Sequence, residues 1–156
     1  MENNTITGTP VTVIEDITKN QIEKVLYTAK VHTTGGREGA SKSSDGRLDI
    51  KHSVPGTPGL GTNPEQLFAA GWSACFEGAM GLAAKQLKVT LPADLAVDAE
   101  VDLGTNTNGY LLQARLNVNL PGIDRETGKA IVEAAHQTCP YSKLSRGNIN
   151  VVINLV

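Results

Sequence analysis

The strongest pattern in the chain is a long apolar segment over residues 64–87. Asn63 and Pro64 open it: Asn caps helix N-termini well, and Pro fits the first helical position, whose N–H has no helical partner. Apolar residues occupy nearly every side of this helix, which indicates a central position. Glu77 and Lys85 interrupt the apolar run. A buried core helix therefore explains the segment better than a membrane span does.

Alternation of apolar and polar positions predicts strands before this helix. Residues 25–33 alternate, which is typical of a half-buried strand. Asp45-Gly46 then lies between two short polar runs and indicates a hairpin, because both positions of such a turn need positive φ. Prolines and glycines in residues 53–61 indicate a loop.

The second half of the chain contains two more alternating runs, a helix and a final strand. Strands are predicted over 95–103 and 111–120, joined by a six-residue loop over 104–109. A helix is expected over 125–138 and a last strand over 149–156. Because helices and strands are segregated rather than strictly alternating, the fold class is α+β.

Length and charge narrow the organisation and the partners. A chain of 156 residues suits one domain, expected over 25–156, and residues 1–24 are expected to form a partly flexible extension. A net charge of −2 and the lack of a basic run argue against nucleic acid or an anionic membrane as the main partner. The polar start carries no visible export signal, so we expect a cytoplasmic location, where cysteines are more often catalytic than structural.

The chain has two cysteines in different settings. Cys75 lies inside the apolar segment, eleven residues past Pro64, and the helix macrodipole fades within the first turn, so its own helix cannot activate it. A reactive Cys75 therefore needs a cation from elsewhere, and Arg37, flanked by glycines that allow close approach, is the natural candidate. The alternative is a small buried hydrophobe, and the residues alone leave both interpretations open.

Cys139 stands directly before Pro140, which ends the predicted helix. Cys139 either ends that helix or caps a new turn that starts at Pro140, and the sequence does not decide between them. No metal site is expected: His136 and Cys139 are three apart, but the chain has only three histidines and no Cys-x-x-Cys pair.

Three aromatic residues surround Cys75 along its helix. They are Phe68, Trp72 and Phe76. Core packing is their default interpretation, and lining an apolar substrate pocket is the sharper hypothesis.

Several strings together resemble the organic hydroperoxide resistance branch of the Ohr/OsmC family. They are Gly-Thr-Asn-Pro-Glu-Gln-Leu-Phe-Ala-Ala-Gly-Trp-Ser-Ala-Cys-Phe (61–76), Cys-Pro-Tyr-Ser (139–142), Arg-Gly-Asn-Ile (146–149), Tyr-Thr-Ala (27–29), Gly-Gly-Arg (35–37) and Ser-Ser-Asp-Gly (43–46). The resemblance covers about residues 25–156. The loop 53–61 looks shorter than is usual for the branch, and the resemblance does not explain the first two dozen residues.

This resemblance implies a thiol peroxidase that protects against oxidative stress. It implies that Cys75 attacks the distal peroxide oxygen to give an alcohol and a sulfenic acid, and that Cys139 condenses with it to a disulfide. The family arginine and glutamate correspond to Arg37, which stabilises the thiolate, and Glu65, which holds the guanidinium by a bidentate pair.

The resemblance also implies the partners and the assembly. The substrates are organic and fatty-acid hydroperoxides, the reductant is dihydrolipoamide on lipoylated proteins, and no cofactor is implied. The implied fold has antiparallel sheets packed around two central helices in an intertwined homodimer. Alternatives are an OsmC-type peroxidase of broader range and a hydroperoxide-sensing or binding module without turnover.

Helix geometry separates Glu65 from Cys75. Glu65 and Cys75 are ten residues apart, which is about 15 Å along one helix, so a single Arg37 cannot easily reach both. We therefore hypothesise that each site combines the two cysteines of one chain with Arg37 and Glu65 of another.

Overall fold

The computed structural model describes residues 11–156, in which Val31–Val156 form one compact unit and the residues up to Lys30 a separate one. Residues 11–30 contain no helix or strand, and their side chains are exposed. The predicted strand over 25–33 is therefore wrong in its first six residues: β1 spans only Val31–Thr34. A strand needs a neighbour for its backbone hydrogen bonds, and among the described residues of the predicted segment these are the ones that have one.

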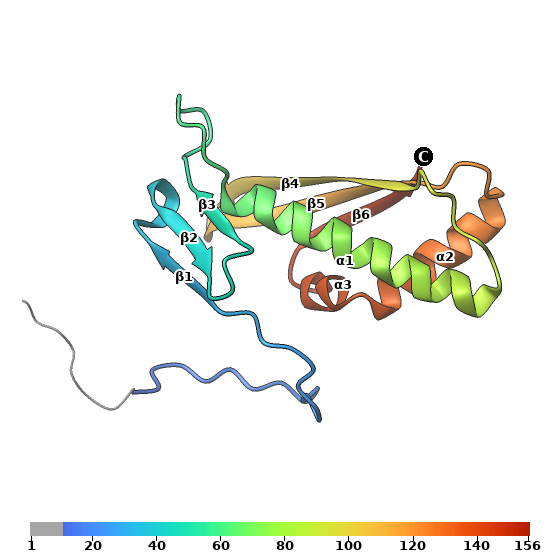
Figure 1. Ribbon diagram of the computed structural model, residues 1–156, viewed down its shortest axis with the longest axis horizontal. Coiled ribbons are helices and arrows are strands. Elements are labelled where there is room, and N and C mark those ends of the chain that lie inside the picture. The colour runs from blue at the N-terminus through green and yellow to red at the C-terminus, as the bar shows by residue number, and fades with distance from the viewer. Residues whose placement is uncertain (1–10) are drawn as a thin grey trace, which may run out of the picture. The chain divides into compact units, whose positions relative to one another are not determined.

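A small antiparallel sheet in the order β1-β2-β3 begins the compact unit (Figure 1). Strand β2 is Ala40–Ser43 and β3 is Asp49–Lys51. The predicted hairpin is confirmed: Gly46 has a φ of 73°, and the Ser43 hydroxyl donates to the Asp45 carboxylate at 2.6 Å. A single 3-10 turn, η1 (Gly36–Glu38), joins β1 to β2 and carries Arg37.

Helix α1 spans Pro64–Leu87, as its sequence signals predict. The Asn63 side chain accepts a hydrogen bond from the Gln66 backbone N–H at 2.9 Å and so caps the first turn. The helix is long and apolar enough to cross a membrane by composition, but Trp72, Phe76 and Met80 are fully buried within the domain.

The C-terminal end of α1 offers a test of local strain. Lys88 caps the helix with φ 56° and ψ 37°, in a left-handed conformation that costs a residue with a side chain about 1 kcal/mol and costs glycine almost nothing. Lys88→Gly is expected to raise the free energy of unfolding by about 1 kcal/mol in urea titrations. Lys85→Gly, inside the last turn, is the control and should lower it by a similar amount. Destabilisation by Lys88→Gly would contradict this cap geometry.

The second sheet has the order β4-β5-β6, with β4 at Ala96–Asn106, β5 at Gly109–Asn119 and β6 at Asn150–Leu155. Strands β4 and β5 are antiparallel, but β6 runs parallel to β5, so the expectation of antiparallel sheets is wrong for this pair. The predicted six-residue loop is also wrong, because the ladder continues to the pair Asn106 and Gly109.

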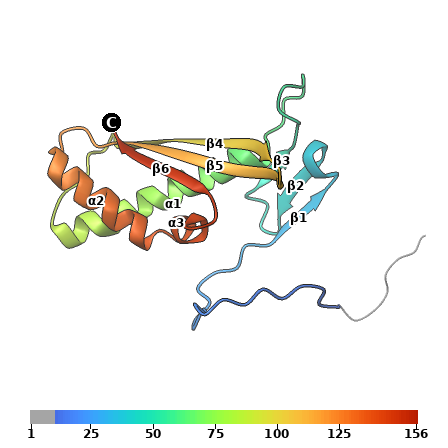
Figure 2. The same cartoon turned by 180° about the vertical axis from the view of Figure 1, so that it is seen from behind.

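Two helices cover the inner face of this sheet, as Figures 1 and 2 show from opposite sides. Helix α1 packs on β4, and α2 (Arg125–Thr138), confirmed as predicted, packs on α1 and β6. The core lies between these layers. Its largest fully buried side chains outside α1 are Leu116, Val118, Ile131 and Cys139. The outer face is polar: Arg115 donates two hydrogen bonds to Asp102, at 2.8 and 3.0 Å. The α+β class is confirmed.

A short helix, α3 (Pro140–Ser145), follows α2 directly. Cys139 has extended backbone angles, φ −61° and ψ 124°, and is both the last cap of α2 and the first cap of α3. Its N–H donates to Ala135 O at 2.9 Å, and its carbonyl accepts from Lys143 N–H at 3.0 Å. The question that the sequence left open is therefore answered: a new helix begins at Pro140.

Candidate functional site

The fold brings the two thiols together from elements far apart in the sequence. Cys75 lies in the middle of α1, and Cys139 lies 64 residues later at the junction of α2 and α3. Their Sγ atoms are 3.3 Å apart, and both cysteines are free thiols. Because a disulfide bond is about 2.05 Å long, closing it needs a shift of only about 1 Å. The pair can therefore be oxidised without rebuilding the fold.

The two sulfurs differ in access. Cys139 is fully buried within the hydrophobic core, whereas Cys75 is only partly buried at its edge. A dissolved reagent therefore reaches Cys75 before it reaches Cys139. The two sulfurs are therefore suited to different steps. Cys75 can contact a dissolved substrate, whereas Cys139 can contact only Cys75.

Aromatic packing holds α3 against α1 beside the thiols. The ring of Phe68 lies 5.4 Å from that of Trp72 and 5.9 Å from that of Tyr141, measured between centroids. The indole N–H of Trp72 donates to the Ser142 hydroxyl at 3.3 Å. Gly71 makes room for this packing, since a Cβ there would lie 2.7 Å from the Tyr141 hydroxyl oxygen.

The aromatic residues proposed for a substrate pocket lie mainly inside the core. Trp72 and Phe76 are fully buried, and Phe68 packs against the core cluster. Trp72 instead contacts Ser142, a residue that sequence reasoning did not single out. Ser142 belongs to the Cys-Pro-Tyr-Ser motif, but no local sequence pattern indicated that it would contact Trp72, 70 residues away.

Arg37 and Glu65 form the second pair, within one chain. Arg37 Nη1 donates to Glu65 Oε2 at 3.0 Å, and Nη2 donates to Oε1 at 2.7 Å, which is the bidentate geometry. The Arg37 hydrogen bonds hold the pKa of Glu65 below its usual value. The turn that presents Arg37 is tight, because a Cβ on Gly39 would overlap the Thr34 carbonyl oxygen.

The Arg37–Glu65 ion pair and the Cys75–Cys139 thiol pair lie beside different parts of α1. Glu65 is in its first turn, and Cys75 follows about 15 Å further along the axis. Burial raises the pKa of Cys75, its hydrogen bond with Cys139 raises it further, and the hydrogen bond that the Tyr141 backbone N–H donates to it opposes both. A raised pKa favours the neutral thiol of Cys75 over the nucleophilic thiolate. Within residues 11–156 of one chain, no cationic side chain is among the groups that shift the pKa of Cys75.

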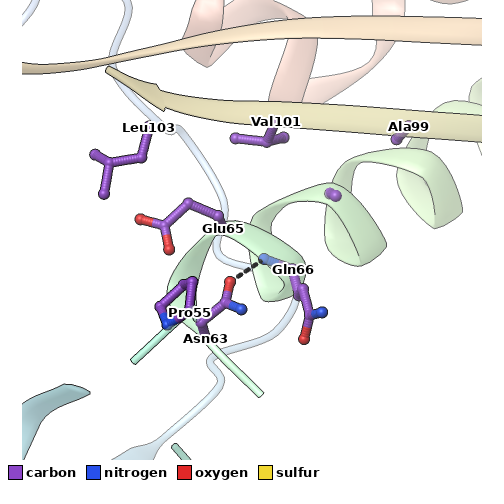
Figure 3. A pocket seen from close by; sticks show the side chains of 8 residues that line it. Pro55, Asn63, Glu65, Gln66, Ala99, Val101 and Leu103 are labelled. Atoms are coloured by element: carbon purple, nitrogen blue, oxygen red, sulfur yellow. Dashed lines mark hydrogen bonds between the residues drawn. The ribbon is translucent and has the colours of Figure 1, made fainter. Parts of the chain in front are cut away.

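Two hollows open beside the Arg37–Glu65 pair, the first of them in Figure 3. One, of about 470 Å³, lies between the start of α1 and strand β4, where Val101 and Leu103 face Glu65. The other, of about 500 Å³, is lined by Arg37, Val54, Pro55, Leu103 and Tyr110. The two hollows share Pro55 and Leu103, and most of their lining is apolar. The ion pair is thus the charged element of a largely apolar surface.

The Arg37–Glu65 pair predicts a pH dependence of stability. Because the folded pKa of Glu65 is lowered, its contribution is present above the unfolded value near 4.5 and is lost as pH falls through the folded pKa. Glu65→Gln is expected to lower the unfolding free energy at pH 7, and the difference from wild type should vanish in acid. Urea titrations from pH 7 to pH 3 measure this. Glu38→Gln, an exposed neighbour of Arg37, is the control. A difference that stays constant with pH would contradict an ionic pair.

Comparison with known proteins places the chain in a family. The OsmC-like protein family matches residues 56–154. The chain belongs to the OsmC-like family. Within it, the chain is 49% identical over 137 residues to the organic hydroperoxide resistance protein of Xanthomonas axonopodis pv. citri, covering 85% of this chain and 96% of that protein.

A solved structure supports the same assignment. The crystal structure of the organic hydroperoxide resistance protein OhrB of Bacillus subtilis superposes with a TM-score of 0.80 at 42% identity, covering 85% of this chain and all of the other. The chain therefore has the Ohr/OsmC fold, and its similarity is to the organic hydroperoxide resistance branch that its motifs indicate.

Proposed function

We propose that the protein is a cysteine-based thiol peroxidase that reduces organic hydroperoxides in the cytoplasm. One observation carries the proposal: the two Sγ atoms lie 3.3 Å apart, and only Cys75 is open to a dissolved substrate. The relatives' names, organic hydroperoxide resistance protein, support a role in peroxide resistance.

The proposed reaction proceeds in two steps at sulfur. The Cys75 thiolate attacks the distal oxygen of the hydroperoxide, the O–O bond breaks, and a proton completes the alcohol that leaves. The resulting Cys75 sulfenic acid then reacts with the Cys139 thiol, which forms the S–S bond and releases water. A dithiol of the dihydrolipoamide type restores both thiols and becomes a cyclic disulfide.

We further propose that Arg37 and Glu65 act on Cys75 of a second copy in a homodimer. The separation of about 15 Å along α1 and the raised pKa of Cys75 both support a cation supplied from outside the chain. The surface also suggests a partner. On α1 an exposed stripe of small residues adjoins Leu82, which is 63% exposed. Val25 and Tyr27, which belong to the alternating segment 25–33, are also exposed and have no strand partner among the described residues.

The substrate's carbon chain is proposed to occupy the hollows beside Arg37, rather than a pocket made by Trp72 and Phe76. Leu103→Asn places a polar amide between the two hollows and is expected to raise KM for a long-chain hydroperoxide several-fold while changing that for tert-butyl hydroperoxide little. Leu111→Asn, on β5 and outside these hollows, is the matched control. Equal effects of Leu103→Asn on both substrates would contradict this assignment.

The experiment that tests the function is steady-state reduction of cumene hydroperoxide with dihydrolipoamide or with thioredoxin as reductant. We expect turnover with dihydrolipoamide, little with thioredoxin, and slow reduction of hydrogen peroxide. A single oxidation followed by arrest, with dihydrolipoamide present, would favour a hydroperoxide sensor. Equal rates with hydrogen peroxide would favour a peroxidase of broader range.

A further inference from the structure

We infer that the thiol reductant attacks Cys75 Sγ of the disulfide and that Cys139 Sγ is the leaving group, so that peroxide and reductant meet the same sulfur in turn. The inference rests on the proposed peroxidase function and deepens it. Either sulfur of a disulfide can in principle be attacked, and access is one of the factors that decide between them.

Access to solvent favours Cys75 as the sulfur that the reductant attacks. Cys139 is 0% exposed and lies within the core cluster, whereas Cys75 keeps part of its surface open. Backbone hydrogen bonds fix Cys139 on both sides, to Ala135 O at 2.9 Å and from Lys143 N–H at 3.0 Å. The guanidinium of Arg146 also donates to the His136 carbonyl at 2.6 Å and holds the end of α2 in place. Closing the last ångström to Cys75 therefore does not bring Cys139 to the surface.

The geometry of thiol–disulfide exchange also favours attack on Cys75. The attacking, central and leaving sulfurs lie nearly in one line as the new bond forms and the old one breaks. Attack on Cys139 would require a thiolate to approach from the side away from Cys75, where Cys139 packs in the core. Attack on Cys75 requires an approach from the side away from Cys139, and Cys75 lies at the core's edge.

The dithiol is the only reagent that this exchange needs. The reductant thiolate forms an S–S bond to Cys75 as the Cys75–Cys139 bond breaks, and Cys139 leaves as a thiolate that takes up a proton. The second thiol of the dithiol then attacks the reductant's own sulfur, which releases Cys75 as a thiolate and leaves the reductant as a cyclic disulfide. Trp72, the one tryptophan of the chain, lies three residues from Cys75 and provides a fluorescence signal for these steps.

Single-cysteine variants test the difference in access. Native Cys139→Ser, which retains Cys75, is expected to react with 5,5′-dithiobis(2-nitrobenzoate) at least about tenfold faster than native Cys75→Ser, which retains Cys139. In 6 M guanidinium chloride the two variants should react at similar rates, which shows that the fold causes the difference. Equal native rates, or faster reaction of Cys139, would overturn the inference.

A trapping experiment tests the attacked sulfur in the wild-type protein. Wild type oxidised with diamide is mixed with 2-mercaptoethanol, quenched within milliseconds by acid, alkylated with N-ethylmaleimide, and mapped by mass spectrometry. We expect mercaptoethanol on Cys75 and maleimide on Cys139 in the trapped species. The reverse pattern, or an even mixture, would overturn the inference. Neither assay uses a hydroperoxide, so a failure of the proposed peroxidase activity would be seen separately.

Discussion

Replacing Cys75 by serine is expected to reduce dithiol-dependent consumption of an organic hydroperoxide to the uncatalysed rate. The thiolate is the nucleophile, and a serine hydroxyl cannot take its place because it is almost never ionised at neutral pH. Cys139 cannot substitute for it, since its sulfur is fully buried. Cys139→Ser should behave differently: Cys75 is still oxidised once, but the nearby thiol that condenses with the sulfenic acid is missing.

Steady-state rates and mass spectrometry together measure this prediction. Cys75→Ser should remain at its reduced mass after exposure to cumene hydroperoxide, whereas Cys139→Ser should gain one oxygen atom at Cys75. Oxidised wild type should contain the Cys75–Cys139 disulfide. Retained turnover in Cys75→Ser, or oxidation of Cys139 in that variant, would contradict the roles assigned to the two sulfurs.

The second large effect is expected at Arg37. A cation close to a thiolate lowers the thiol pKa by about 1 to 3 units, so Arg37→Met should cut the thiolate fraction at pH 7 by about tenfold to a thousandfold. The rate of hydroperoxide reduction should fall by a similar factor. Glu65→Gln should cause a smaller loss, because the guanidinium remains but is no longer held at both nitrogens.

The pH profile of Cys75 alkylation by iodoacetamide measures this directly. In Arg37→Met the midpoint should move to higher pH, and raising the pH should recover much of the lost activity. Lys42→Met is the control, since Lys42 is a cation on the same small sheet that pairs with Asp49 instead. An unchanged alkylation midpoint in Arg37→Met would show that Arg37 does not activate the thiol.

The elements predicted correctly from the sequence are those with local signals. The Asn63 cap and Pro64 mark where α1 begins, and Asp45-Gly46 marks a turn that few other residues can make. Strands without such signals depend on their neighbours. The alternating residues 25–30 form no strand because they have no ladder partner among residues 11–156. The parallel pairing of β6 with β5 joins segments that the sequence separates by α2 and α3.

The residues of the candidate site could be predicted from local motifs, but several contacts around them could not. The motifs identify Cys75, Cys139, Arg37 and Glu65, and helical spacing alone indicates that two of them lie about 15 Å apart. The contact between Trp72 and Ser142 and the hollow lined by Leu103 and Tyr110 are tertiary features. No local pattern predicts this contact or this hollow, because each joins residues from elements that are far apart in the sequence.

In the proposed homodimer, one peroxidase site needs Cys75 and Cys139 of one copy and Arg37 and Glu65 of another. The most direct test is to unfold Cys75→Ser and Arg37→Met together in equal amounts, refold them, and measure hydroperoxide reduction. Half of the dimers then carry both variants, and each of these has one intact site, so the mixture should recover about a quarter of wild-type activity. Activity no greater than the average of the two separately refolded variants would contradict a site shared between two copies.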